Sequence, residues 1–262
     1  MIQIGRQWLT VVAVLMAIAV NGISNIYPPA GKNTADVSNT TLGGVMITPE
    51  GYAFAIWGLI YLGLIAYSIY QALPAQRHIP AFQKVSWAVI GACGLQMVWI
   101  YLFLTYQFWA SVLFMLGILA CLAFAYVTTR SVKSTRKVRW LLQAPISIYF
   151  AWITLATVLN VSGAIYAMAI PQDRIADFSD VITASTSGVV ATVVMMCVSA
   201  GLGAIVALNY RDMSYPAVVI WGLIAIAIRN AALSPIAFVG ISMAVALCII
   251  IVRLKSTRPG QT

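Results

Sequence analysis

Nearly all basic residues in this chain fall in every second gap between long apolar runs, which is the pattern of a protein that crosses a membrane repeatedly. The runs are residues 8–26, 51–70, 85–104, 108–127, 140–162, 188–208, 215–228 and 233–252. Most contain about 20 residues, which as an α-helix cover the roughly 30 Å of a bilayer's hydrocarbon core. Because lipid offers the backbone no hydrogen-bond partners, each run must be helical. We therefore expect an all-α, polytopic transmembrane bundle of about eight helices.

The distribution of charge also predicts an orientation. With the N-terminus in the cytoplasm, the inner side holds Arg6, Arg77, Lys84, Arg130, Lys133, Arg136, Lys137, Arg139, Arg211, Arg253, Lys255 and Arg258, and the outer side holds Lys32, Arg174 and Arg229. This excess of basic residues inside is what topology rules require. We expect an integral, multi-pass protein of a bacterial cell (inner) membrane, with its N-terminus in the cytoplasm.

The net charge of +9 does not indicate nucleic-acid binding. The hydrophobic fraction is 62%, and no large domain lies outside the apolar runs. The most basic loop, 130–139, lacks interleaved aromatic residues, and its charge is explained by contact with anionic lipid head groups. The bilayer is therefore an expected partner and nucleic acid is not.

Two of the runs allow a second interpretation. The first, 8–26, follows Arg6 as a cleaved signal peptide would, but removing it would spoil the charge asymmetry, so a retained helix is the preferred prediction. The seventh, 215–228, would be only about 21 Å long as a helix. If it does not cross the membrane, the C-terminus lies on the other side.

The apolar runs contain no carboxylate. Ion-coupled carriers usually keep an ionisable group at membrane depth, and hydrolases need a general base beside their nucleophile. Both classes are disfavoured, and we expect no enzymatic activity. A membrane enzyme acting on a porphyrin or lipid would have to use light, oxygen or Tyr and Trp redox chemistry.

Metal binding is not expected either. The four cysteines lie singly in four different runs, and His78 is the only histidine. Asp173, Asp177 and Asp180 are spaced so that they could share one helical face in an outer loop. A solvated loop is the simpler interpretation, with a metal or substrate site as the alternative.

Three runs carry aromatic and amide side chains spaced by three or four residues, as on one face of a helix. The residues are Phe54, Trp57 and Tyr61 in the second run, Gln96, Trp99 and Phe103 in the third, and Tyr149, Trp152, Ala156 and Asn160 in the fifth. An amide at membrane depth needs a partner, so Gln96 and Asn160 either bridge helices or face a ligand. Aromatic walls with a few polar groups suit a large, flat, mostly apolar molecule, and helix packing alone is the alternative.

These motifs resemble the TspO/MBR family, the translocator proteins also called tryptophan-rich sensory proteins. The matching residues are Thr48-Pro49 before Phe54, Trp57 and Tyr61, then Leu95-Gln96, Trp99 and Phe103, and finally Tyr149, Trp152, Ala156, Leu159 and Asn160. The chain departs from the family pattern in four ways: Thr48 replaces a proline, Phe54 lies one residue nearer the Trp, Gln96 replaces an Asn, and Ile148 stands where a Pro is usual. The resemblance implies a five-helix core over residues 1–162, with residues 163–262 adding about three helices.

The resemblance further implies a pocket among the first, second and fifth helices that binds a tetrapyrrole such as haem or protoporphyrin, or a sterol. No cofactor is required, and a tetrapyrrole would be a ligand. The predicted ligand-binding residues are Phe54, Trp57, Tyr61, Gln96, Trp99, Tyr149, Trp152 and Asn160. Family members often form homodimers, and small residues such as Gly240 and Ala244 could pack a helix interface.

The function predicted from the sequence is a membrane receptor or translocator for a bulky apolar or tetrapyrrole-type molecule. The long connection 27–50 could act as a lid over the pocket or be a mobile outer loop without a ligand role. The alternative function is a small-solute facilitator or exporter that uses all the helices. Its polar path would include Ser199, Asn209, Asn230 and Ser234.

Overall fold

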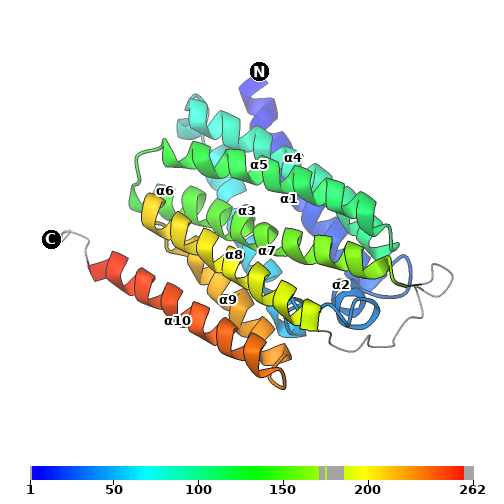
Figure 1. Ribbon diagram of the computed structural model, residues 1–262. Coiled ribbons are helices and arrows are strands. Elements are labelled where there is room, and N and C mark those ends of the chain that lie inside the picture. The colour runs from blue at the N-terminus through cyan, green and yellow to red at the C-terminus, as the bar shows by residue number, and fades with distance from the viewer. Residues whose placement is uncertain (1, 171–174, 176–185, 257–262) are drawn as a thin grey trace. The chain divides into compact units, whose positions relative to one another are not determined.

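The computed structural model describes residues 2–170, 175 and 186–256, and within these it is helical with no strand (Figure 1). The predicted all-α fold class is confirmed. The long helices are α1 (Ile2–Ile26), α3 (Ile56–Ala72), α4 (Pro80–Leu104), α5 (Phe108–Arg130), α7 (Ala144–Ala167), α8 (Thr186–Tyr210), α9 (Ser214–Arg229) and α10 (Ser234–Ser256). The predicted loop aspartates Asp173, Asp177 and Asp180 lie outside the described residues.

Short helical segments complete the described chain. They are α2 (Thr34–Asp36), the π-helical turn η1 (Val37–Thr41), the 3-10 turns η2 (Gly51–Ala55) and η3 (Pro74–Gln76), α6 (Arg136–Val138) and the π-helical turn η4 (Arg139–Gln143). α2 begins with a capping box, in which the Asn33 side chain accepts from the Asp36 N–H and the Asp36 carboxylate accepts from the Asn33 N–H. Part of the 27–50 connection is therefore helical.

In the described part of the chain, seven helices are long and apolar enough to cross a membrane. The chain is therefore an integral, multi-pass membrane protein. The run predicted at 215–228 forms α9, which has 16 residues and a length of about 24 Å. α9 is thus the short helix that the sequence indicated.

The chain divides into two compact units. Unit 1 comprises Met1–Leu42 and Phe54–Ser179, and unit 2 comprises Gly43–Ala53 and Asp180–Thr262. The domain boundary predicted between residues 162 and 163 stays a prediction. What the sequence did not indicate is that Gly43–Ala53, from the connection between the first two spans, belongs with the C-terminal helices.

The helices of unit 1 form a closed ring. α1 packs against α3, α3 against α7, α7 against α5, α5 against α4, and α4 against α1. Close approach is possible where a residue is small: a Cβ on Gly63 of α3 would lie 3.1 Å from the Cβ of Pro145 in α7. Side chains that point inward from this ring therefore meet in its middle.

Unit 2 is a three-helix bundle of α8, α9 and α10, each packed against the other two. Gly240 and Ala244 of α10 are buried in it. A Cβ on Gly240 would lie 2.9 Å from Met196 Cε, 3.0 Å from Ala227 Cβ and 3.1 Å from the Leu223 carbonyl oxygen. This small-residue pair thus packs α10 inside the chain, so it offers no exposed surface to a second copy.

The close packing at Gly240 predicts that Gly240→Val lowers the free energy of unfolding by about 1–3 kcal/mol, because the larger side chain overpacks the α8–α9–α10 contact. Gly201→Val is the matched control, since no atom outside its own helix lies within 4 Å of a Cβ at that position of α8. Thermal unfolding of the purified protein in detergent measures both. Equal losses in the two variants would contradict the packing role of Gly240.

Candidate functional site

All eight predicted ligand-binding residues lie in unit 1, on the helices α3, α4 and α7 or on η2, the turn directly before α3. η2 and α3 carry Phe54, Trp57 and Tyr61, α4 carries Gln96 and Trp99, and α7 carries Tyr149, Trp152 and Asn160. The five residues on α4 and α7 are buried, and Phe54, Trp57 and Tyr61 are half-buried. The structure brings these residues together in two clusters.

The first cluster is a hydrogen-bonded bridge of three side chains. Gln96 Nε2 donates to the Tyr61 hydroxyl over 3.2 Å, and the Tyr149 hydroxyl donates to Gln96 Oε1. Gln96 is 2% exposed and Tyr149 is fully buried. In the ring of helices, α4 lies between α1 and α5, across from α3 and α7. The hydrogen bonds from Gln96 to Tyr61 and Tyr149 therefore cross the middle of the bundle. We name Tyr61, Gln96 and Tyr149 the central bridge.

The Trp57 ring packs against two residues of the central bridge, and a second aromatic pair joins η2 to α7. The Trp57 ring lies 5.5 Å from the Tyr61 ring and 6.1 Å from the Tyr149 ring. Phe54 meets Trp152 edge to face, with ring centroids 6.0 Å apart. The predicted aromatic faces of the second and fifth spans therefore do converge, in geometries that aromatic pairs favour.

The second cluster is centred on Asn160. Trp99 Nε1 donates to Asn160 Oδ1 over 2.9 Å, and Asn160 Nδ2 donates to the Ser111 hydroxyl over 2.9 Å. The Trp99 ring stacks on Phe103, with centroids 5.3 Å apart. This cluster joins α4, α5 and α7. Ser111 could not be identified from the sequence, because a lone serine in an apolar run has no spacing that indicates its partner.

The two amides thus bridge helices in this structure, which is one of the two roles that the sequence left open. Each amide's oxygen and nitrogen have partners in other helices, so neither leaves a buried polar group unsatisfied. The partners are hydroxyl and indole groups, which can exchange one hydrogen-bond partner for another. Whether the clusters bind a ligand stays a prediction.

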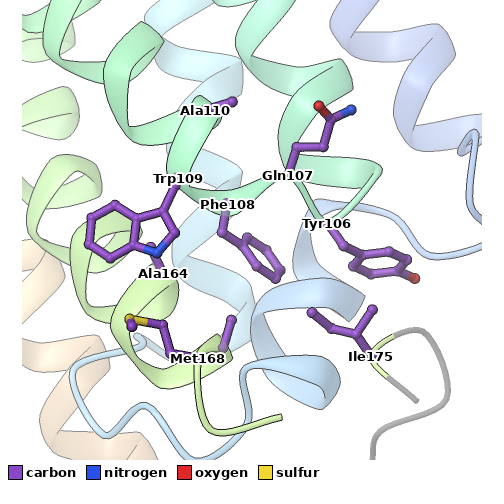
Figure 2. Close-up of a pocket in the computed structure, with 9 residues that line it drawn as sticks. Tyr106, Gln107, Phe108, Trp109, Ala110, Ala164, Met168 and Ile175 are labelled. Carbon is purple, nitrogen blue, oxygen red and sulfur yellow. The ribbon is translucent and has the colours of Figure 1, made fainter. Parts of the chain in front are cut away.

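A cavity of about 220 Å³ opens at another place in unit 1, between the start of α5 and the end of α7. Figure 2 shows the rings of Tyr106, Phe108 and Trp109 pointing toward Met168 and Ile175. None of the eight predicted residues lines it. Pockets for drug-sized ligands usually measure about 300–1,000 Å³, so the volume of this cavity lies below that range.

The segment Gly43–Ala53, which leads into the first cluster, is bound to α9 in unit 2. Asn230 Nδ2 donates to the Met46 carbonyl over 2.8 Å, and Trp221 Nε1 donates to the Ala53 carbonyl over 3.0 Å. The Glu50 N–H donates to the Ala225 carbonyl over 3.2 Å. The residue after this anchored segment is Phe54, so the predicted lid is held at its C-terminal end by α9.

Of the four residues predicted for a polar path in the C-terminal helices, two make hydrogen bonds of other kinds and two are exposed. Ser199 donates to the Met195 carbonyl of its own helix over 2.9 Å, and Asn230 is used to hold Gly43–Ala53. Asn209 and Ser234 are exposed. Ser199 and Asn230 therefore have hydrogen-bond partners within unit 2, and the side chains of Asn209 and Ser234 lie on its surface.

Comparison with known proteins gives one family. The family model described as "TSPO-like protein" matches residues 7–253, and so includes α8, α9 and most of α10. The sequence resemblance had rested on residues 8–162 alone. A search of curated proteins found no match, and neither did a search of solved structures.

The Trp99–Asn160 hydrogen bond predicts energetic coupling between α4 and α7. In a double-mutant cycle of Trp99→Phe and Asn160→Ala, we expect a coupling of about 1 kcal/mol, as for other interhelical hydrogen bonds in membranes. The readout is unfolding of the purified protein in detergent. A cycle of Trp87→Phe with Asn160→Ala is the control, since Trp87 is on α4 but 54% exposed. Equal coupling in the two cycles would contradict the assignment.

The anchoring of Gly43–Ala53 predicts that Asn230→Ala exposes this segment. Losing one hydrogen bond of about 1 kcal/mol should raise amide hydrogen exchange at Glu50 about fivefold. The control is Asn209→Ala, which removes an exposed amide from α8 of the same unit. Unchanged exchange in Asn230→Ala would show that the segment is held by other contacts.

Proposed function

Since the chain belongs to the TSPO-like protein family, and is a membrane receptor or translocator-like protein by that membership, we propose that it takes a bulky apolar or tetrapyrrole-type molecule into the ring of unit 1. The observation that carries this proposal is the central bridge of Tyr61, Gln96 and Tyr149, with the Trp57 ring packed against it. It places aromatic surface and exchangeable polar groups in the middle of the bundle.

The chemistry of these residues supports a flat, mostly apolar ligand. The rings of Phe54, Trp57 and Trp152 present faces and edges that gain from stacking on another aromatic system. Gln96 offers both a donor and an acceptor, which can orient a polar edge such as a pyrrole nitrogen or a carboxylate. A few polar groups among aromatic walls are typical of cofactor-sized sites.

Binding in this proposal replaces internal hydrogen bonds rather than filling unpaired ones. Both polar atoms of the Gln96 side chain are hydrogen-bonded to the hydroxyls of Tyr61 and Tyr149. A ligand that enters between α3 and α7 would separate these hydroxyls from the amide and take their place. The cost of breaking these internal hydrogen bonds selects ligands that offer a polar edge as well as an apolar face.

The remaining expectations belong to the same proposal. The role is non-enzymatic and needs no bound cofactor, and the tetrapyrrole is a ligand. The membrane is a bacterial inner membrane with the N-terminus in the cytoplasm, supported by the excess of basic residues in alternate loops. A homodimer would have to use a surface other than Gly240 and Ala244, which are buried inside unit 2.

We expect protoporphyrin to quench the tryptophan fluorescence of the purified protein, and Tyr149→Phe and Trp152→Ala to weaken its binding about tenfold. Tyr149→Phe removes only the hydroxyl of the central bridge, and Trp152→Ala removes aromatic surface at the site. The measurement is a fluorescence titration in detergent or nanodiscs, repeated with haem and a sterol.

Two variants outside the cluster serve as controls. Tyr101→Phe removes a hydroxyl from α4, where Tyr101 is 56% exposed, and Trp87→Ala removes an exposed indole from the same helix. Both should bind protoporphyrin within about twofold of the unaltered protein, the range usual for surface changes. Unchanged affinity in Tyr149→Phe and Trp152→Ala would remove the assignment of the site to the central bridge.

A further inference from the structure

A buried arginine lies at the end of unit 1 where α1 begins, α3 ends and α4 begins. Arg6 is 3% exposed. Its Nη1 donates to the Ser86 hydroxyl over 2.6 Å and to the Phe82 carbonyl over 3.3 Å, and its Nη2 donates to the Arg77 carbonyl over 3.4 Å. Its Nε donates to Gln3 Oε1 over 3.2 Å. Every one of these acceptors is neutral.

The described residues of unit 1 supply no carboxylate at this end. Residues 1–35 and 51–172 contain neither Asp nor Glu. Asp36, in α2, follows the opposite end of α1, and the 21 residues from Arg6 to Ile26 alone extend about 30 Å. A buried charge without an opposite charge is costly, even when it is fully hydrogen-bonded. The balancing charge for Arg6 must therefore come from outside these residues of unit 1.

Arg77 lies beside Arg6 and is held in a fixed orientation. Its Nε donates to Gln7 Oε1 over 3.2 Å. Gln7 is itself fixed by Gln71, because Gln7 Nε2 donates to the Gln71 carbonyl over 2.7 Å and Gln71 Nε2 donates to the Gln7 carbonyl over 2.9 Å. Arg77 is only half-buried. Among the described residues, its two terminal nitrogens have no hydrogen-bond or ion-pair partner.

We propose that Arg77, with the charge of Arg6 behind it, binds the phosphate group of an anionic lipid at this end of unit 1. A guanidinium whose orientation is fixed through Nε presents its terminal N–H groups as a fork, which matches two phosphate oxygens. The phosphate supplies the negative charge that unit 1 lacks here. Nothing in the proposed ligand site depends on it.

The position of the site favours a lipid as the source of the phosphate. It lies where the apolar spans α1, α3 and α4 begin or end, which is the level of the lipid head groups. Leu73 and Ile79, in the connection that carries Arg77, and Trp87 on the first turns of α4 are 46%, 36% and 54% exposed. Apolar and indole side chains at this level pack against lipid, and basic pockets between helix ends bind anionic head groups.

The test uses the full chain in detergent, with lipid binding followed by native mass spectrometry. Phosphatidylglycerol should remain bound where phosphatidylcholine does not. Arg77→Gln should weaken phosphatidylglycerol binding about tenfold, the effect of losing a charge-assisted hydrogen bond, and Arg77→Lys should fall between the two because it keeps the charge but not the fork. Arg136→Gln is the control for the general attraction of the basic loop 130–139 to anionic head groups. It removes the same charge from an exposed position in α6, and because a screened surface charge contributes little, it should change binding less than about twofold.

The outcomes separate the two sources of phosphate. A parallel thermal-shift titration with inorganic phosphate distinguishes a soluble anion from a lipid. Stabilisation by inorganic phosphate that equals the effect of phosphatidylglycerol and is lost in Arg77→Gln would support the phosphate site and overturn the lipid as its occupant. Equal losses in Arg77→Gln and Arg136→Gln, or no preference for phosphatidylglycerol over phosphatidylcholine, would overturn the site itself. Arg77→Lys keeps the test valid if Arg77→Gln does not fold.

Discussion

A polar side chain inside an apolar bundle must find a partner within it, and this requirement organises unit 1. Gln96 and Asn160 each reach across to other helices, and Arg6 donates to hydroxyl and carbonyl acceptors in α4 and in the α3–α4 connection. Apolar contacts between helices have little directional preference, especially where lipid competes for the same surface. These few polar contacts can therefore determine which helices face each other and in which register.

The sequence predicted the helices well and their side-chain partners poorly, for a physical reason. Run length and the demands of lipid on the backbone are local, so the spans and the shortness of α9 could be read directly. The convergence of Trp57 and Tyr149 could also be expected, because each belongs to a recognisable helical face. The partner of Gln96 depends on the relative register of three helices, which no spacing within one helix contains. Ser111 was missed for the same reason.

Arg6 illustrates a different kind of limit. By sequence it belongs with the basic residues of the inner side, which topology alone explains. In the structure Arg6 is 3% exposed, and it donates hydrogen bonds to atoms of α4 and of the connection between α3 and α4. Its side chain therefore contributes to helix packing as well as to membrane orientation. A charged residue at the end of a span is buried when other helices surround it. Which helices these are cannot be inferred from the sequence of its own helix.

The anchoring of Gly43–Ala53 on α9 has a consequence for how the chain is made. The partners of this segment lie 168 to 186 residues further along the sequence. At the roughly 5–20 residues per second of protein synthesis, α9 emerges about 10 to 40 seconds after the segment it holds. The second span must therefore enter the membrane before its preceding segment has made these contacts, and unit 2 can be completed only after α9 has been synthesised.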